Sequence, residues 1–393
     1  MSRLKELIQE LCPNGVEYRE IEEVANYEQP SKYIVKSTKY DDSYVTPVLT
    51  AGQTFILGYT NETDGIFQAS KDNPVIIFDD FTGAFKWVDF PFKVKSSAMK
   101  IITTKENNMP LRYLFHIMGY LGFKSDEHKR LWISIYSRLE IPVPPLEVQR
   151  EIVRILDNFT ELTAELTAEL TARKKQYEYY KDMLLTFDVR GGATSDVAWR
   201  TLGEVCNVVS GGTPSKKEIN YWANGTIKWL GSTVCQNQKT VTEVTDYITE
   251  NGLKNSSAKM MNEETTLIAL VGATIGKVAF LPFKAAINQN IAGVYPKDLK
   301  QLNPSYVYYA CTTLYPKFLA LTQGSKLAMA NMSFVRSLPI AVPPMKVQER
   351  LVHVLDNFDT ICSDLNIGLP AEIEARQKQY EFYRDKLLSF KQL

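Results

Sequence analysis

An internal duplication constrains this chain more than any other feature of its sequence. Residues 141–149 (IPVPPLEVQ) recur 199 positions later as 340–348 (IAVPPMKVQ), and residues 156–159 recur as 355–358 at the same offset. Weaker echoes upstream have offsets of 181 and 191, and an echo downstream has an offset of 203. Because the offsets only increase along the chain, they describe one duplicated unit whose second copy carries small insertions.

Each unit ends in a predicted helix. From Val148 to Leu184 the apolar residues are spaced by three and four positions, which predicts a helix of about 40 residues. Pro144-Pro145 suits its first turn. The second copy repeats the stripe, but Gly368 and Pro370 predict a break. The two stripes most simply pack together as an antiparallel coiled coil, and two unrelated core helices are the alternative.

A tetrapeptide repeat lies within the first predicted helix. It reads Thr163-Ala164-Glu165-Leu166 and then Thr167-Ala168-Glu169-Leu170. Four residues advance a helix by about 400°, so the leucines stay on one face, and each repeat lengthens the helix by about 6 Å. We therefore predict that these residues form a spacer of adjustable length.

The segments before the two helices predict short strands broken by turns, for example at 75–78 and 266–271. The fold class is therefore α+β, with two pseudo-symmetric α/β domains separated by long helices that form an antiparallel coiled coil. We expect the N-terminal helix to lie beside the C-terminal one, and docking of a partner on it is the alternative. The predicted boundaries are an N-terminal helix at 1–14, a first domain at 15–140, a central helical spacer at 141–187, a linker at 188–196, a second domain at 197–339 and a C-terminal helical spacer at 340–393.

Composition narrows the class of protein. The 393 residues contain no run of about 20 apolar residues and no signal-peptide core, so we expect a cytoplasmic protein without a membrane partner. The five cysteines are scattered and have no histidine at metal-ligand spacing, so we expect neither a metal site nor disulfides.

Charge is unevenly distributed although 45 basic and 45 acidic residues cancel. Residues 207–339 contain 13 lysines and arginines against seven acidic residues, a net charge of +6, and residues 86–138 are also rich in basic residues. Such clusters suit DNA phosphates, and nearby aromatic and amide side chains can read base edges; a solvated basic face is the alternative. The predicted DNA contacts are Lys93, Lys100, Lys129, Arg130 and Trp132 in the first domain and Thr213, Ser215, Lys216, Lys277, Asn288 and Lys326 in the second.

No catalytic motif is evident in the sequence. Residues 272–277 are similar to a phosphate-binding loop, but the glycine spacing is one short and Val278 stands where a metal-binding hydroxyl is needed. Residues 143–146 lack the polar and aromatic residues of an amino-methyltransferase motif, and no Gly-rich cofactor loop follows a strand. The histidines have no evident nucleophile or paired ligand. We predict a non-catalytic chain without a cofactor or metal of its own.

These features together resemble the specificity subunit of type I restriction-modification systems over essentially the whole chain, and the tetrapeptide repeats are similar to those of the IC subfamily. The resemblance is carried by Pro-Pro-x-x-x-Gln at Pro144 and Pro343, Gln-Tyr-Glu-aromatic-Tyr at Gln176 and Gln379, and the segments 211–215, 272–277 and 288–290.

The resemblance implies that each domain, a target-recognition domain, reads one half of a split site in double-stranded DNA, while the coiled coil sets the gap. It also implies that the helices dock two modification subunits, which bind S-adenosylmethionine and methylate adenine. Restriction subunits then add ATP- and Mg-dependent translocation and cleavage. A helical protein-protein scaffold without DNA recognition is the alternative function. A self-contained methyltransferase would need the motifs that are missing.

Overall fold

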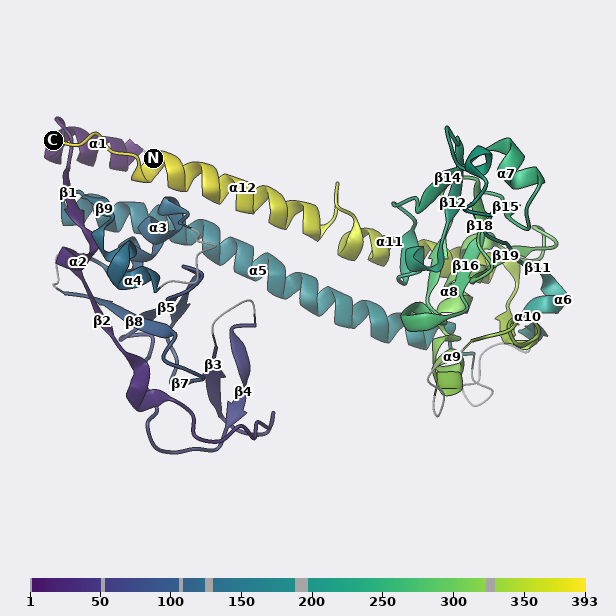
Figure 1. The fold of residues 1–393 in the computed structure, drawn as a ribbon, viewed down its shortest axis with the longest axis horizontal. Helices are drawn as coiled ribbons and strands as arrows, with labels where there is room; N and C mark the ends of the chain where they lie inside the picture. The colour runs from purple at the N-terminus through teal and green to yellow at the C-terminus, as the bar shows by residue number, and fades with distance from the viewer. Residues whose placement is uncertain (1, 51–53, 106–108, 124–129, 188–196, 323–328) are drawn as a thin grey trace. The chain divides into compact units, whose positions relative to one another are not determined.

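The computed structural model describes residues 2–50, 54–105, 109–123, 130–187, 197–322 and 329–393 (Figure 1). The predicted linker at 188–196 lies outside them. The chain divides into two compact units, and each contains one mixed domain and part of the long helices. Unit 1 comprises Met1–Thr167 and Glu372–Leu393, and unit 2 comprises Ala168–Ala371.

In unit 1 the mixed domain contains a sheet of order β2-β8-β5-β6 and a smaller sheet of order β4-β3-β7. β5 is buried along its whole length, as a central strand covered on both faces requires. The predicted strand at 75–78 is therefore confirmed. The strands are β1 (Glu17–Glu20), β2 (Ala25–Glu28), β3 (Thr46–Leu49), β4 (Ile56–Thr60), β5 (Val75–Asp79), β6 (Phe85–Val88), β7 (Lys93–Val94), β8 (Met99–Thr104) and β9 (Glu140–Val143).

Helices pack on the larger sheet of unit 1 and bury a core rich in aromatic residues. The helices of this part of the chain are α1 (Ser2–Leu11), α2 (Ile21–Val24), η1 (Pro30–Tyr33), α3 (Leu111–Leu121), α4 (Leu131–Ser134), η2 (Tyr136–Arg138), the long α5 (Leu146–Leu185), which continues into unit 2, and α12 (Leu369–Leu388).

Unit 2 has a sheet of order β11-β19-β16-β17-β13 and a second of order β14-β12-β18-β15. Its strands are β10 (Ala198–Thr201), β11 (Cys206–Ser210), β12 (Ile227–Leu230), β13 (Gln238–Thr240), β14 (Asp246–Ile248), β15 (Lys259–Met261), β16 (Thr266–Ala269), β17 (Val278–Phe280), β18 (Ala285–Ile287), β19 (Ile291–Pro296) and β20 (Pro339–Val342). Its helices are α6 (Leu202–Val205), η3 (Ile219–Tyr221), η4 (Ser232–Val234), α7 (Glu250–Lys254), η5 (Gly272–Thr274), α8 (Pro304–Thr312), α9 (Tyr315–Thr322), α10 (Met332–Ser337) and α11 (Met345–Ser363).

The same two-stranded pair closes each mixed domain. In unit 1, β1 pairs antiparallel with β9, with Glu17 opposite Val143. In unit 2, β10 pairs antiparallel with β20, with Ala198 opposite Val342. The partners are displaced by 181 and 199 positions, the offsets found in the sequence. The duplication therefore preserves hydrogen-bond register as well as residue type, and the predicted pseudo-symmetry is confirmed.

A buried tyrosine ties each domain to the strand that precedes its helix. Tyr113 on α3 donates to the carbonyl of Pro142 at 3.1 Å, and Tyr306 on α8 donates to the carbonyl of Ala341 at 2.9 Å. Both rings are almost completely buried. Since a buried hydroxyl needs a partner, this contact fixes α3 and α8 in the same orientation in the two copies.

The long helices pair antiparallel within each unit (Figure 1). In unit 1, Phe159 of α5 stacks on Tyr383 of α12 with ring centroids 5.2 Å apart. In unit 2, Tyr180 of α5 stacks on Phe358 of α11 at 6.0 Å. The 40 residues of α5 thus have a different helical partner in each unit. The predicted antiparallel packing of the two stripes is confirmed.

Two further predictions about the helices are confirmed. The C-terminal segment breaks between Ser363, where α11 ends, and Leu369, where α12 begins. The N-terminal residues lie against the C-terminal ones: the amide of Val16 donates to the carbonyl of Lys391 at 2.9 Å, and Leu4 shares a core with Leu388. Among the described residues, no helix is long and apolar enough to cross a bilayer.

A carboxylate on the helix anchors α3 in unit 1. Asp157 of α5 accepts from Nε of Arg112 at 2.7 Å and lies 2.8 Å from Nε2 of His116, whose Nδ1 lies 3.0 Å from the hydroxyl of Tyr380 on α12. Burial alone would raise the pKa of Asp157, but hydrogen bonds from His116 and Arg112 hold it below its usual value. Burial lowers the pKa of His116 despite the neighbouring carboxylate.

The equivalent carboxylate in unit 2 is Asp356 of α11, 199 positions later. It accepts hydrogen bonds from the hydroxyl of Tyr309 on α8 and from Lys239. Tyr309 follows His116 by 193 positions, the same offset that relates the two buried tyrosines. A histidine in one copy is thus replaced by a tyrosine in the other while the carboxylate is kept.

This difference predicts that acid weakens unit 1 through His116. The unfolded chain binds a proton on His116 at a higher pH than the folded chain does. The free energy of unfolding should therefore fall as the pH drops below about 6.5, by at most about 1.4 kcal/mol per pH unit. His116→Tyr, which copies unit 2, should remove this part of the pH dependence.

Urea unfolding at pH 7.5 and 5.5, followed by tryptophan fluorescence, measures the effect. The control is His353→Tyr, since His353 is exposed on α11 and should leave the pH dependence as it is. Equal pH dependence in the natural protein and His116→Tyr would contradict the role assigned to His116.

Candidate nucleic-acid interface

Two polar segments singled out in the sequence meet at the surface of unit 2. The amide of Gly211 donates to the carbonyl of Asn288 at 3.2 Å, and Oγ1 of Thr213 donates to Oε1 of Gln289 at 2.7 Å. A Cβ on Gly211 would lie 1.8 Å from the carbonyl oxygen of Ile287, so only glycine permits this approach. The segments 211–215 and 288–290 therefore form one surface, on which the side chains of Thr213, Ser215 and Gln289 are exposed.

The loop at 272–277 adjoins this surface. The carbonyl of Asn290 accepts from the amide of Leu270, just before the loop, at 2.9 Å. Gly272 has φ of +69°, and nothing lies within 4 Å of the position a Cβ would take, so the loop is open to solvent at its start. Lys277 is half-buried and its Nζ donates to Oε1 of Gln236 at 3.2 Å. The side chains of Lys277 and Gln236 therefore lie together at the edge of the loop.

Lys216 is held at the surface by an aromatic ring and a carboxylate. Its Nζ lies 3.3 Å from the centroid of Trp222 and 2.7 Å from Oδ2 of Asp246. The hydrogen bond from Lys216 lowers the pKa of Asp246. Trp222 packs edge-on against Trp229, whose Nε1 donates to the carbonyl of Gly212 at 3.1 Å. The lysine is thus positioned by the same loop that carries Thr213.

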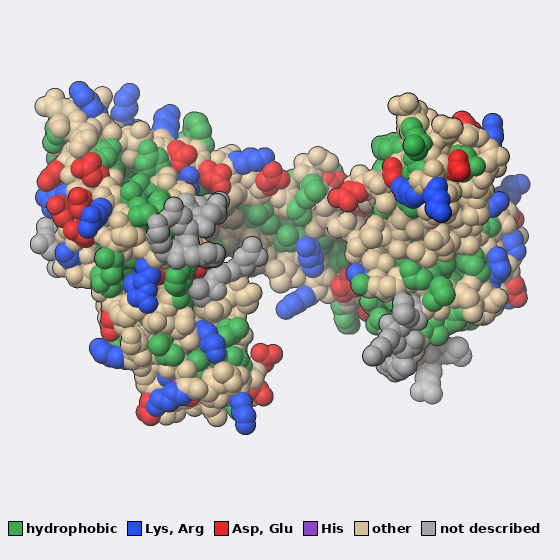
Figure 2. All heavy atoms as spheres, in the orientation of Figure 1, with side chains coloured by type: hydrophobic (Ala, Val, Ile, Leu, Met, Phe, Trp, Pro, Cys, Tyr) green, Lys and Arg blue, Asp and Glu red, His purple; other side chains and the backbone are tan. Residues whose placement is uncertain are grey.

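Basic side chains are frequent on the surface of unit 2. Figure 2 shows Lys and Arg side chains grouped along its outer edge, beside hydrophobic side chains. The exposed basic residues of unit 2 outside the helices α5 and α11 include Lys216, Lys217, Lys254, Lys259, Lys284, Lys297, Lys300, Lys317 and Arg336. The net positive charge expected from the sequence is therefore presented to solvent.

One predicted contact in unit 2 has another role. Asn288 is 7% exposed, and its Oδ1 accepts from the amide of Asn290 at 2.9 Å, so it shapes the loop. The exposed amide of this loop belongs to Gln289. Ser215 is exposed, and its carbonyl accepts from Nε1 of Trp222 at 3.0 Å. Lys326 lies outside the described residues.

In unit 1 the structure corrects two predictions. Lys93 is 1% exposed and pairs with Glu62 at 3.0 Å, and Lys100 is completely buried and pairs with Asp80 at 3.0 Å. A buried ammonium in an ion pair cannot reach a phosphate unless the pair breaks, which is costly. Predicting DNA contacts at these two lysines was therefore wrong, because their acidic partners are distant in sequence and were not foreseen.

The remaining predictions in unit 1 divide between core and surface. Trp132 is 2% exposed and stacks on Tyr136 with ring centroids 5.7 Å apart, so it belongs to the core and its prediction as a DNA contact is corrected. Arg130 precedes α4 and is exposed. Lys129 lies outside the described residues. Arg130 is thus the predicted residue of this domain that the structure places at the surface.

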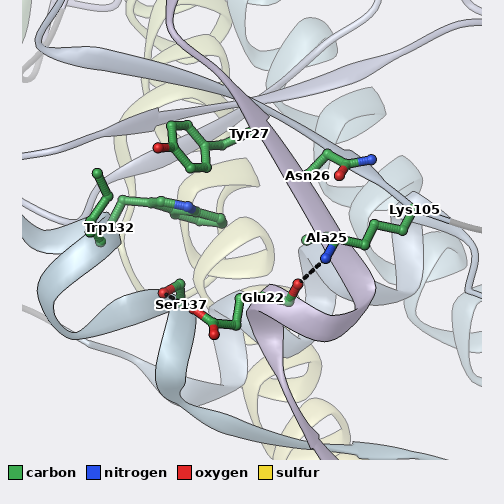
Figure 3. Close-up of a pocket in the computed structure, with 8 residues that line it drawn as sticks. Glu22, Ala25, Asn26, Tyr27, Lys105, Trp132 and Ser137 are labelled. Carbon is green, nitrogen blue, oxygen red and sulfur yellow. Dashed lines mark hydrogen bonds between the residues drawn. The ribbon is translucent and has the colours of Figure 1, made fainter.

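A groove of about 290 Å³ lies on unit 1 beside Trp132 (Figure 3). Tyr27 and Ile133, which line it, are 46% and 54% exposed. The Tyr27 ring lies 6.2 Å from that of Trp132. The sequence did not indicate this groove, because its walls come from three separate segments, at 22–27, 105 and 132–137.

The lysine that lines this groove has a structural role. Lys105 donates to the carbonyl of Glu22 in α2 (Figure 3), and in unit 2 Lys297 donates to the carbonyl of Gly203 at 2.6 Å. The two carbonyls are 181 positions apart, so the contact belongs to the duplicated framework.

Among the described residues, no group of three or more His, Cys, Asp or Glu side chains could hold a metal ion.

Comparison with known proteins identifies the family to which the chain belongs. The family described as "Type I restriction modification DNA specificity domain" matches residues 13–173 and 194–375, one segment for each copy of the duplication. The chain belongs to this family. It is 45% identical to the type I restriction enzyme EcoR124I/EcoR124II specificity subunit of Escherichia coli, over 99% of this chain and 98% of that one. It is 28% identical to the putative specificity subunit S.HindORF215P of Haemophilus influenzae, over 95% and 96% of the two chains.

Solved structures of the family have the same fold. The S subunit of a type I restriction-modification system from M. genitalium aligns with a TM-score of 0.61 at 13% identity, over 96% of this chain and 97% of that one. A structure described as the basis of complex assembly and conformational transition of the type I R-M system aligns with a TM-score of 0.59 at 18% identity. Like its relatives, the chain is a DNA-specificity subunit and not the catalytic component.

Surface residues that the sequence analysis did not select complete the interface in unit 2. Gln289 contacts Thr213, Trp222 lies under Lys216, and Gln236 accepts from Lys277. Gln289 sits in the quoted segment 288–290, so choosing the amide next to Asn288 could have found it. Gln236 has no local signal, because its contact with Lys277 joins residues 41 positions apart, whereas Trp222 follows Lys216 by only six positions and could have been considered with it.

The burial of Lys100 predicts losses of stability of very different size for two lysine variants. Lys100→Ala leaves the carboxylate of Asp80 buried without its partner, although the amide of Trp132 still donates to it at 2.8 Å. The free energy of unfolding should fall by about 3–5 kcal/mol. Lys216→Ala breaks an exposed pair and should cost less than about 1 kcal/mol. Urea unfolding of both variants measures this, and a small loss in Lys100→Ala would contradict the structural role.

Proposed function

We propose that each mixed domain reads one half of a bipartite site in double-stranded DNA. The observation that carries this proposal is the duplicated framework, which keeps the β1-β9 and β10-β20 pairs and the buried tyrosines while the surface loops differ. Loops that differ on equal frameworks suit two unrelated half-sites. In unit 2, Lys216 would contact phosphate, and the exposed Thr213 and Gln289 would donate to or accept from base edges.

The long helices set the gap between the half-sites. One tetrapeptide repeat adds about 6 Å to a helix, which compares with one or two base-pair rises of about 3.4 Å. The leucines of the repeats, Leu166 and Leu170, and the preceding Leu162 are all half-buried, as residues on one packed face of α5 are. A change of four residues therefore alters length while it leaves that face in register.

The partners we propose are two modification subunits, docked by the helical segments, and restriction subunits that join them. Two equivalent docking surfaces follow from the duplication: the pattern in which Arg173 pairs with Glu169 and contacts Gln176 recurs as Arg376 with Glu372 and Gln379. S-adenosylmethionine, ATP and Mg belong to those partners in this proposal. This chain supplies binding and orientation only.

Variants in unit 2 test which domain reads which half-site. With the modification subunits present, Thr213→Ala should relax discrimination at one half-site by about 1–3 kcal/mol and leave the other half-site unchanged. Lys216→Ala should weaken binding to all sequences and reduce the slope of log affinity against log salt concentration by about 1.

The measurement is the binding of duplexes altered in one half-site, at several salt concentrations. Lys5→Ala is the control, because Lys5 is an exposed lysine of α1 in the other unit and should change neither property. Equal effects on both half-sites would contradict the assignment of one domain to each. Failure of the natural complex to bind duplex DNA would favour the protein-protein scaffold.

A further inference from the structure

The chain passes between the two units twice, and the two passages are built differently. The first lies at 167/168, inside α5 and inside the tetrapeptide repeats, and the second lies at 371/372, in the first turn of α12. α5 is one continuous helix. The C-terminal segment is interrupted just before its passage, between Ser363 and Leu369.

Aromatic contacts allow the lengths of the two passages to be compared. Within unit 1, Phe159 of α5 stacks on Tyr383, and within unit 2, Tyr180 of α5 stacks on Phe358. The two residues of α5 are 21 positions apart, whereas their C-terminal partners are 25 positions apart. The C-terminal passage therefore contains four residues more than α5 does between the same contacts. This surplus equals the length of one tetrapeptide repeat.

The surplus coincides with a compact turn at 364–368. Oδ1 of Asp364 accepts from the amide of Asn366 at 2.6 Å and from that of Ile367 at 3.1 Å, and the amide of Gly368 donates to the carbonyl of Asp364 at 3.2 Å. A Cβ on Gly368 would lie 2.5 Å from the carbonyl oxygen of Thr360. A few hydrogen bonds and one glycine thus hold the turn closed.

Pro370 keeps this turn from becoming continuous helix. In the interior of a helix it would remove one hydrogen bond and clash with the carbonyl four residues earlier, that of Asn366. The segment can change length in another way, because an extended residue spans about 3.3 Å and a helical residue only 1.5 Å. Opening the turn therefore supplies length, whereas α5 can gain length only through added residues.

We propose that α5 alone sets the separation of the two DNA-reading domains and that the turn at 364–368 is a compliant connection that adjusts to it. The inference rests on the proposed function for its consequence in DNA recognition. The turn opens when α5 gains a repeat. When α5 loses a repeat, the turn accommodates a larger number of residues in excess of those in α5. The number of repeats can then vary while the C-terminal segment keeps its sequence.

Two insertions of equal length test this proposal. One variant receives a third Thr-Ala-Glu-Leu repeat after Leu170, and the other receives four glycines between Asn366 and Ile367. Each is expressed with the modification subunit, and the methylated sites are mapped across a genome. The added repeat should lengthen the gap by one or two base pairs, and the glycines should leave both gap and half-sites unchanged. A changed gap in the glycine variant would overturn the proposal, as would an unchanged gap in the repeat variant.

A second measurement does not depend on DNA. In the variant with three repeats, the amides of Asn366, Ile367 and Gly368 should exchange hydrogen about fivefold faster than in the natural chain, because opening the turn removes their acceptors. The amides of Leu351 and Leu355 in α11 should be unchanged. Unchanged exchange in the turn would overturn the proposal even if DNA recognition is normal. Faster hydrogen exchange in the turn, without any bipartite methylated site, would support the compliant turn and contradict the proposed function.

Discussion

The placement of each mixed domain on its helices depends on one carboxylate, Asp157 in unit 1 and Asp356 in unit 2. Each projects from a long helix and accepts hydrogen bonds from the helix of the neighbouring domain. In unit 1 the network continues through His116 to Tyr380, so α3, α5 and α12 meet around a single group. Such partly buried networks are costly to break, so they hold a domain in one orientation on its helix.

A fixed orientation matters because the length of these helices has a function in the proposal. If a domain could rock on its helix, a change of four residues in α5 would be lost in the motion of the domain. With α3 and α8 fixed by their tyrosines and carboxylates, we propose that the length of α5 sets the separation of the two half-sites. Packing and hydrogen bonds thus orient each domain on its helix, exposed loops differ between the copies, and in the proposed function α5 sets the spacing of the half-sites.

Much of this architecture could be predicted from the sequence, because repetition and periodicity are local signals. The duplicated segments predicted the two units, and the spacing of apolar residues predicted α5. Gly368 and Pro370 predicted the break between α11 and α12. The choice of contact residues was less successful. Lys93 and Lys100 look like surface lysines in short strands, and only folding brings Glu62 and Asp80 to them.

Aromatic residues misled the sequence analysis in the same way. Trp132 follows a basic stretch, as a residue that stacks on bases would, yet it packs on Phe78 and Tyr136 in the core. The sequence analysis did not select Trp222, which lies under Lys216 at the surface. Burial is decided by the partners that tertiary structure supplies, and the sequence of a single loop carries little information about them.

The most direct test of this account removes one repeat. Adenine methylation is mapped across a genome in cells that express the natural chain, or the chain lacking residues 163–166, together with the modification subunit. The account predicts a split motif whose gap shortens by one or two base pairs in the deletion while both half-sites stay the same. Half-sites that change while the gap does not, or a motif that does not depend on this chain, would contradict it.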